Sequence, residues 1–360
     1  MNYKKLNNMY DLVYGKLRGI IVKRTMEKKY KLRVKNNGLF TKEHKKIVEY
    51  FYAPYAKVNT LYHKVYSECT GYFSEKYLPV DLYFNVVDAY FNNRAEARFL
   101  DNKCYYKKLF PGIKQPETVI ARIGGFWFDE NEQLIDYNKA KEIVSQESAL
   151  FMKAATESCG GRGILYISEE KGNMVEQFES FNNSGDFVVQ RPVKQHKEMC
   201  AVNDSSVNTL RIISLLTENE VKIYSAIVRA GQKGSKFDNA TGGGVAIGVT
   251  EDGRLKKYGY QISGERFEKH PTNGFVFEGH QIPSYDKAVE MVKKAHPMVP
   301  HFRLVSWDIC IEEDGEPILL EANLCRGSLD VHQYNNGPLF GEDTKKILDE
   351  IFGKKIRKNN

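Results

Sequence analysis

The sequence predicts an α+β protein in which a mainly helical N-terminal region precedes two mixed segments. Apolar residues recur at helical spacing over residues 38–95, and from about residue 96 short alternating runs separated by Gly and Pro predict strands. An Asp-Gly pair between two apolar runs near the C-terminus predicts a β-hairpin. We therefore expect a basic amphipathic arm (1–37), a helical region (38–95), a segment with a glycine loop (96–195) and a segment with a metal site (196–360).

Composition excludes several classes of protein. The chain has 360 residues, enough for two or three domains, and its six cysteines lack the CxxC spacing of zinc sites. Scattered thiols of this kind indicate a reduced, cytoplasmic protein. No run approaches the roughly 18 apolar residues of a membrane span, and the N-terminus lacks the continuous apolar segment of a signal peptide.

The positive net charge of the chain, +7, arises from residues 1–35 of the arm. Residues 1–35 contain eleven Lys or Arg and two acidic residues, which gives +9 and leaves about −2 for the remainder. The rest of the chain therefore lacks the excess of basic residues that is typical of nucleic-acid-binding proteins, and we expect no nucleic-acid partner. Within the arm, apolar residues at helical spacing alternate with basic ones (Tyr10, Val13, Tyr14, Leu17, Ile20, Ile21). This pattern predicts either peripheral contact of residues 1–35 with the inner face of a membrane or a helix docked on its own domain.

The helical region begins with a cap signal. Thr41 precedes Glu43 and the run HKKIVEYFYAPY, which predicts a capped helix that ends near Pro54. The many aromatic residues that follow, up to residue 92, favour a helix core over a sugar- or peptide-binding surface.

The third segment carries a glycine loop between two predicted strands. Gly160, Gly161 and Gly163 allow close backbone approach, so successive N–H groups can form an anion-binding nest. Lys153, on the strand before the loop, supplies a point charge for phosphate, and Lys103 is a second candidate cation. The loop is neither a P-loop nor a Rossmann loop.

A further hairpin is predicted around Asn219. Thr209 and Arg211 share one strand face, and Arg229 lies near the end of the returning strand. An arginine in this place can bind phosphate or carboxylate with two parallel hydrogen bonds, or form an ordinary strand ion pair.

The C-terminal hairpin, residues 303–323, predicts a metal site. With Asp314 and Gly315 as the loop, Asp308 lies opposite Glu321, and Asn323 shares their face. Five apolar residues are then expected on the other face (Trp307, Ile309, Ile311, Ile318, Leu320). Two carboxylates and an amide oxygen suit Mg²⁺, which usually also binds substrate phosphates. The alternative is a solvated edge with incidental acids, but opposed like charges favour a bound cation.

The order of these motifs resembles the ATP-grasp superfamily. The motifs that carry this resemblance are LDNK, FMKAA, SCGGRGI, VVQRPV, NTLR and WDI…LLEAN. Within the superfamily, the chain is most similar to the sugar-transfer-associated ATP-grasp proteins, as shown by QRPVKQH, FDNATGGG and GHQIPSYDKA. The resemblance covers roughly residues 38–345. The resemblance implies the ATP-grasp fold, in which ATP lies between two α+β lobes. One departure is Gln190, where many ATP-grasp proteins have an acid.

The resemblance also implies roles for residues. Phosphates would be held by Lys103, Lys153 and the loop of Ser158, Gly160, Gly161 and Gly163; the adenine pocket would run from Gln190 to Val193; and Mg²⁺ would be bound by Asp308, Glu321 and Asn323. Arg211 and Arg326 are our candidates for the acceptor carboxylate and the transferred phosphoryl group, and Lys153 also counts among the catalytic candidates. His196 could take an ammonium proton, although a structural role is favoured.

The implied activity is an ATP- and Mg²⁺-dependent carboxylate–amine ligase that works through an acyl phosphate. Its substrates would be an amine and a carboxylated sugar or peptide-like acceptor in capsule or exopolysaccharide biosynthesis, with a glycosyltransferase system as a possible partner. Two alternatives stay open: a kinase-like phosphotransferase, and a non-catalytic nucleotide-binding adaptor.

Overall fold

The computed structural model describes residues 24–156, 163–181, 185–232 and 243–358. Their Cα positions divide into two compact units. The first contains the residues up to Val87, Ser263–Glu265 and the C-terminal segment from Gly337, and the second contains Asp88–Ile262 and Arg266–Asn336. The mixture of helices and sheets agrees with the predicted α+β class, and the arm residues 1–23 lie outside the described part of the chain.

The first unit is helical, as expected. Besides a helix over residues 24–31 it contains α2 (Lys42–Tyr52), α3 (Leu61–Thr70), α4 (Val80–Leu82), the π-helical turn η1 (Tyr83–Val87), η7 (Gly341–Asp343) and α13 (Thr344–Lys358). Thr41 caps α2: its hydroxyl accepts from the His44 N–H, and the Thr41 N–H donates to the His44 ring. The predicted capped helix is therefore confirmed. Tyr52, Tyr62 and Tyr66 are fully buried, so these aromatic residues form helix core.

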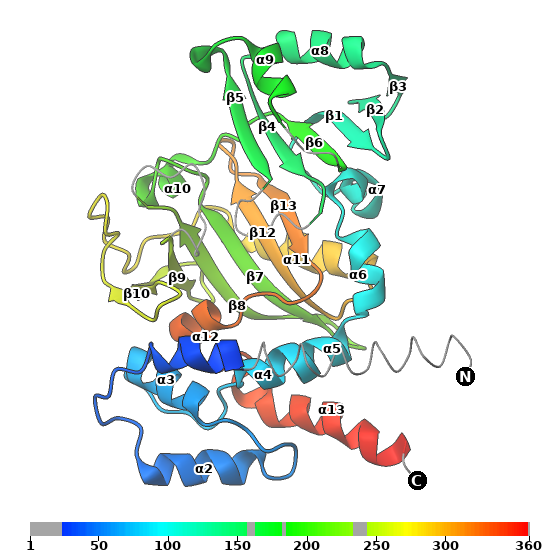
Figure 1. Ribbon diagram of the computed structural model, residues 1–360. Helices are drawn as coiled ribbons and strands as arrows, with labels where there is room; N and C mark the ends of the chain where they lie inside the picture. The colour runs from blue at the N-terminus through cyan, green and yellow to red at the C-terminus, as the bar shows by residue number, and fades with distance from the viewer. Residues whose placement is uncertain (1–23, 157–162, 182–184, 233–242, 359–360) are drawn as a thin grey trace. The chain divides into compact units, whose positions relative to one another are not determined.

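In the second unit, a six-stranded antiparallel sheet follows a group of short helices. The helices are α5 (Asp88–Phe91), α6 (Arg94–Leu100), η2 (Lys103–Tyr105) and α7 (Tyr106–Leu109). The strands have the order β3-β2-β1-β6-β4-β5 and are β1 (Thr118–Ile123), β2 (Phe126–Asp129), β3 (Leu134–Ile135), β4 (Ala149–Ala154), β5 (Ile164–Ser168) and β6 (Phe187–Gln190). One face is covered by α8 (Tyr137–Ser145) and α9 (Met174–Glu179), which follows the turn η4 (Glu169–Lys171) (Figure 1).

A seven-stranded antiparallel sheet forms the rest of the second unit. Its order is β11-β10-β9-β8-β7-β12-β13, with β7 (Thr209–Leu216), β8 (Val221–Ala230), β9 (Val245–Val249), β10 (Leu255–Tyr260), β11 (Arg266–Phe267), β12 (Leu304–Ile311) and β13 (Pro317–Asn323). The helices around it are α10 (Lys197–Val202), α11 (Tyr285–Ala295), η6 (His296–Met298) and α12 (Asp330–Asn336). Buried residues of α10 and α11 pack on one face, while α12 lies across β8, β9 and β10 (Figure 1).

In the β12–β13 hairpin the two acids pair as predicted, but the loop and the residue pairs next to it differ from the prediction. Asp308 lies opposite Glu321, as expected, but Ile309 pairs with Leu319 and Ile311 with Pro317. The loop is longer than two residues, because the Glu312 N–H donates to the Glu316 carbonyl and Gly315 has a φ of 83°. A register shift between Asp308 and Ile309, which is a β-bulge, restores the pairing of the two acids.

This register corrects part of the face assignment. Leu319 packs in the core with Trp307, Ile309 and Ile311, whereas Ile318 pairs with Cys310 and lines a cavity on the other face. The prediction for Ile318 was therefore wrong, because it assumed an uninterrupted ladder behind a two-residue loop.

Candidate functional site

The centre of the candidate site is Asp308, which is 4% exposed. In the ladder it lies between Arg211 of β7 and Glu321 of β13. Arg211 holds both carboxylate oxygens: its Nε donates to Oδ1 at 2.5 Å and its Nη2 to Oδ2. Arg229 of β8 adds a contact from Nη1 to Oδ2 at 3.3 Å. Burial alone would raise the pKa of Asp308, but the two guanidiniums outweigh it and hold that pKa below its usual value.

Glu321 is paired with a lysine that comes from the short helices. Lys103 Nζ lies 2.7 Å from Glu321 Oε1, and η2 is placed by a hydrogen bond from the Lys103 N–H to the Ala155 carbonyl at 3.0 Å. The structure thus brings together Lys103 and Glu321, residues more than 200 positions apart. Two positions before Lys103, burial raises the pKa of Asp101 to about 6, and sequence reasoning gave no indication of this acid.

Lys153 points from β4 toward the same group of residues. It pairs with Ile164 of β5 and Val188 of β6 on the sheet face opposite α8 and α9. Burial, and next the charge of Lys103, lowers the pKa of Lys153 to about 8. The charge of Glu321 acts in the opposite direction, so all three side chains are within electrostatic reach of one another.

Ser328 and His332 complete the surroundings of the arginines, and sequence reasoning missed both. Arg211 Nη1 donates to Ser328 Oγ at 3.1 Å. His332 of α12 lies with its Nδ1 2.7 Å from Ser225 Oγ on β8. Burial, and next the charge of Arg211, lowers the pKa of His332 to about 3, so its imidazole is neutral and adds no charge. The sequence shows only that Ser328 and His332 follow the strand that carries Glu321, and this position does not predict which side chains they contact.

The oxygen donors fit a Mg²⁺ ion that arrives with phosphate. Asn323 Nδ2 donates to the Ser306 carbonyl at 3.1 Å, so the amide oxygen is its remaining ligand atom. Asp308 and Glu321 each bind a cationic side chain, which a metal ion would have to displace. In the described part of the chain no three His, Cys, Asp or Glu residues gather as a metal site. A mixed set of two carboxylates and one amide suits Mg²⁺ when phosphate oxygens and water complete the coordination.

The glycine loop lies mostly outside the described residues, including Ser158, Gly160 and Gly161. Gly163 is described and has a φ of 73°. Its carbonyl accepts from the Ala154 N–H at 2.7 Å, and an added Cβ would lie 2.9 Å from the Ala154 Cβ. Glycine is required here because the backbone is left-handed and crowded against β4.

The predicted adenine residues line two neighbouring cavities. Gln190 and Lys103 line one of about 650 Å³, to which β13 contributes Leu319 and Leu320. Val193 and Ile318 line another, of about 490 Å³. Gln115, Pro116, Glu117 and Arg191 border both cavities.

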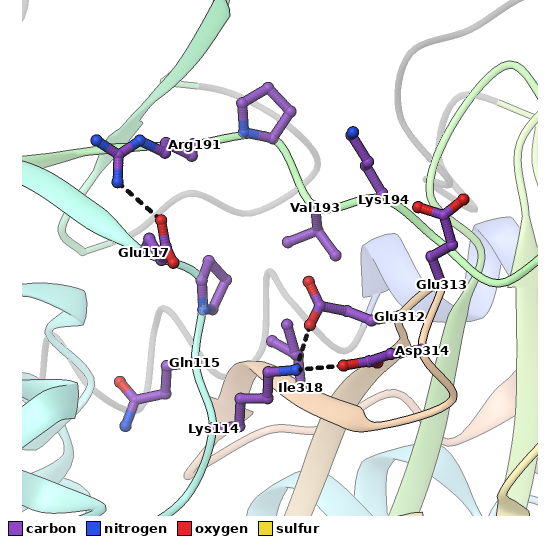
Figure 2. Close-up of a pocket in the computed structure, with 12 residues that line it drawn as sticks. Lys114, Gln115, Glu117, Arg191, Val193, Lys194, Glu312, Glu313, Asp314 and Ile318 are labelled. Carbon is purple, nitrogen blue, oxygen red and sulfur yellow. Dashed lines mark hydrogen bonds and ion pairs between the residues drawn. The ribbon is translucent and has the colours of Figure 1, made fainter. Parts of the chain in front are cut away.

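Figure 2 shows the second cavity, where ion pairs fix the surrounding segments. Lys114 bridges Glu312 and Asp314 of the hairpin loop, at 2.6 and 3.2 Å. Arg191 pairs with Glu117 at 2.8 Å. Val193 and Ile318 supply apolar surface between these pairs.

Two other candidates make contacts outside this group of ion pairs. The Arg326 N–H donates to Asp88 at 2.7 Å, and Asp88 in turn pairs with Arg94. The second guanidinium beside Asp308 is that of Arg229, and the role of Arg326 stays a prediction. His196 caps α10, where its Nδ1 accepts from the Glu198 N–H at 3.2 Å.

Comparisons with known proteins relate the chain to one family. The sequence model of the family described as sugar-transfer associated ATP-grasp matches residues 87–348. No curated protein matches the sequence. Solved structures with similar folds include D-alanyl-alanine synthetase A from Vibrio cholerae (13% identity, 70% of this chain and 63% of that chain, TM-score 0.39). An L-amino acid ligase from Bacillus licheniformis has 14% identity over 70% of this chain and 48% of its own, with a TM-score of 0.39.

The biotin carboxylase domain of 2-oxoglutarate carboxylase from Hydrogenobacter thermophilus, solved with MgADP, ADP and bicarbonate, has 15% identity and a TM-score of 0.43. The match covers 70% of this chain and 45% of that one. This chain thus spans less than two thirds of the length of each of these three structures. Among the described residues, none of the helices combines the length and apolar character needed to cross a bilayer.

Proposed function

The chain belongs to the sugar-transfer-associated ATP-grasp family, and from this premise we propose that it is an ATP- and Mg²⁺-dependent ligase that joins a carboxylate to an amine. The family confirms the resemblance seen in the motifs and gives the chain the ATP-grasp fold. The observation that carries the proposal is the convergence of Lys103, Lys153, Arg211 and Arg229 on the opposed acids Asp308 and Glu321.

The charge of this group favours a polyanion. Four cationic side chains and two carboxylates give a net charge of +4 − 2 = +2. A triphosphate with one bound Mg²⁺ remains negative and would compensate that charge. Asp308, Glu321 and Asn323 would hold such an ion, whose positive charge would neutralise charge that develops on the phosphates. The chain's own cations would do the rest by positioning, since phosphoryl transfer needs little covalent help from the protein.

The proposed reaction has two steps. An acceptor carboxylate oxygen attacks the γ-phosphorus of ATP, the bond to the β-phosphate oxygen breaks, and ADP leaves an acyl phosphate. An amine then attacks the acyl carbon, inorganic phosphate leaves, and the ammonium proton is lost, which yields an amide. Arg211 and Arg229 are the groups best placed to hold the two anionic reactants together, because each guanidinium reaches the same carboxylate and extends along one sheet face.

We place the nucleotide along the two cavities. Lys103 and Lys153 would bind its phosphates, the loop of Ser158, Gly160, Gly161 and Gly163 would cover them, and Gln190 to Val193 would line the adenine. Gln190 donates to Thr118 Oγ at 3.1 Å, so its amide orientation is already fixed. Asp308, Glu321 and Asn323 would hold the ion, with Lys153, Arg211 and Arg326 as catalytic candidates.

The family description supports a substrate from sugar metabolism. We propose a carboxylated sugar or peptide-like acceptor and an amino acid or other amine, in capsule or exopolysaccharide biosynthesis alongside glycosyltransferases. A cytoplasmic location, at the inner membrane face, belongs to the same proposal.

A phosphate-release and ADP-release screen of uronic acids against amino acids tests the proposal. We expect ADP release that requires one acid and one amine, with a product whose mass equals their sum minus water. A phosphate ester of the acceptor would instead identify a kinase, and nucleotide binding without turnover would identify an adaptor. Lys153→Ala should abolish turnover, whereas Lys287→Ala, which removes an exposed lysine paired with Glu316, should leave it unchanged.

A further inference from the structure

The described part of the N-terminal arm concentrates positive charge on one short segment. Residues 24–35 contain six Lys or Arg and one acid, which is +5 of the chain's total of +7. The other 348 residues therefore share about +2. A charge density of this kind attracts an anionic surface, and the attraction falls with salt.

This segment is fixed on the helical unit through one side of its helix. Tyr30 is 1% exposed and packs edge-to-face on Tyr62 of α3, with ring centroids 4.7 Å apart. The backbone N–H groups of Lys35 and Asn36 both donate to the Glu68 carboxylate at 2.9 Å. The segment is thus held in place by its own unit, and its outward side chains form a preformed surface.

The outward side consists of lysines around an exposed leucine. Lys28, Lys29, Lys31 and Lys35 are exposed, and among the described residues no acid forms an ion pair with them. Leu32, one helical turn after Lys28, is 82% exposed. The single acid, Glu27, accepts a hydrogen bond from Asn59 at 3.0 Å and so belongs to the docked side. We call Lys28, Lys29, Lys31, Leu32 and Lys35 the basic face.

We infer that the basic face binds the surface of an anionic lipid bilayer, with the lysines at the headgroups and Leu32 inserted between them. Lysines around an apolar side chain fit this interface, because charge attracts the anionic lipids and the leucine gains by leaving water. Nucleic acid is a poorer fit: the one aromatic residue of the segment is the buried Tyr30, so no ring is available for stacking on bases. The inference does not rest on the ligase proposal.

Co-sedimentation of the full chain with vesicles tests it, with phosphatidylcholine alone compared with phosphatidylcholine containing phosphatidylglycerol. We expect binding to the anionic vesicles only, weakened by added salt. The quadruple variant K28Q/K29Q/K31Q/K35Q should lower the partition coefficient by about 100-fold or more, given the usual contribution of each lysine near an anionic surface. Leu32→Ser should lower it by about tenfold with little change in the salt dependence.

Two matched controls separate this face from general charge and hydrophobicity. K139Q/K257Q/K287Q/K293Q removes the same charge from exposed lysines of the other unit, and Leu134→Ser removes a leucine that is 66% exposed. Neither control should reduce vesicle binding appreciably. Equal loss in both quadruple variants, or equal binding to neutral and anionic vesicles, would overturn the inference. So would stronger competition by RNA than by added anionic vesicles that carry the same total charge.

Discussion

Asp308 and Glu321 lie directly opposite each other on β12 and β13, and each is neutralised by a cation from another part of the chain. Like charges in opposed positions destabilise a strand pair. Here Arg211 and Arg229 compensate Asp308, and Lys103 compensates Glu321. The hairpin therefore depends on contacts that a bound nucleotide and metal would rearrange.

Asp308→Asn should cost both stability and activity. The change leaves Arg211 and Arg229, each with side chains only 12% exposed, without their shared counter-charge. Removing one partner of a buried ion pair typically costs about 3–5 kcal/mol. We expect a loss of that order in the free energy of unfolding by urea, and loss of ATP turnover. Glu290→Gln, which removes an exposed carboxylate paired with Lys293 on α11, is the control and should change neither. Wild-type turnover in a folded Asp308→Asn protein would remove Asp308 from the site.

Mg²⁺ and nucleotide should bind cooperatively. The oxygens of Asp308 and Glu321 that a metal would use are engaged by Arg211 and Lys103. Phosphates can draw these cations away and supply further ligands, whereas Mg²⁺ alone must displace them. Calorimetry should therefore show at least about tenfold tighter Mg²⁺ binding with a non-hydrolysable ATP analogue present, a coupling of ordinary size. The reciprocal titration must give the same factor, and independent binding of the two ligands would contradict this arrangement.

Nucleotide affinity should fall as the pH rises through the pKa of Lys153, which is about 8. The ammonium form attracts phosphate, and at pH 9 about one molecule in ten retains it, so the Kd for ATP should rise about tenfold between pH 7 and pH 9. Lys153→Arg stays protonated and should flatten this profile. Stability should change in the opposite direction: between pH 8 and the ordinary lysine value of 10.5 the unfolded chain holds more protons, so the free energy of unfolding should rise with pH. Equal slopes for both proteins would exclude Lys153 as the titrating group.

Sequence reasoning succeeded where a short-range pattern determines the structure. The cap at Thr41, the strand that carries Lys153 and the opposition of Asp308 and Glu321 all follow from local spacing. The face of Ile318 did not follow from local spacing, because a bulge is one extra residue whose position depends on both strands.

The ion pairs of the site could not be predicted from the sequence either, for a different reason. Lys103 meets Glu321, and Arg229 meets Asp308, through tertiary folding, and no spacing in the chain encodes which arginine reaches which acid. Arg326 illustrates this: its nearness to Asn323 in sequence suggested the site, whereas its backbone is bonded to Asp88. Its assignment to the acceptor carboxylate stays a prediction.

The last prediction concerns the core beneath Asp308. Trp307 Nε1 donates to Ser214 Oγ at 2.8 Å, Ser214 Oγ lies 2.7 Å from His296 Nδ1, and His296 Nε2 lies 2.9 Å from the Phe302 carbonyl. Since a carbonyl only accepts, His296 carries its proton on Nε2, and the Ser214 hydroxyl donates to Nδ1. The hydroxyl thus satisfies two buried groups at once.

Ser214→Ala should therefore leave both the Trp307 N–H and the His296 Nδ1 without a partner, which costs about 1–3 kcal/mol for each group. Urea unfolding should show a loss of roughly 2–6 kcal/mol. Ser306→Ala is the matched control, because the Ser306 hydroxyl is equally buried but has no hydrogen-bond partner among the described residues. That substitution should be neutral or slightly stabilising. Equal losses in the two variants would mean that the hydroxyl of Ser214 contributes only volume, and that the strand carrying Asp308 is not held by this chain of hydrogen bonds.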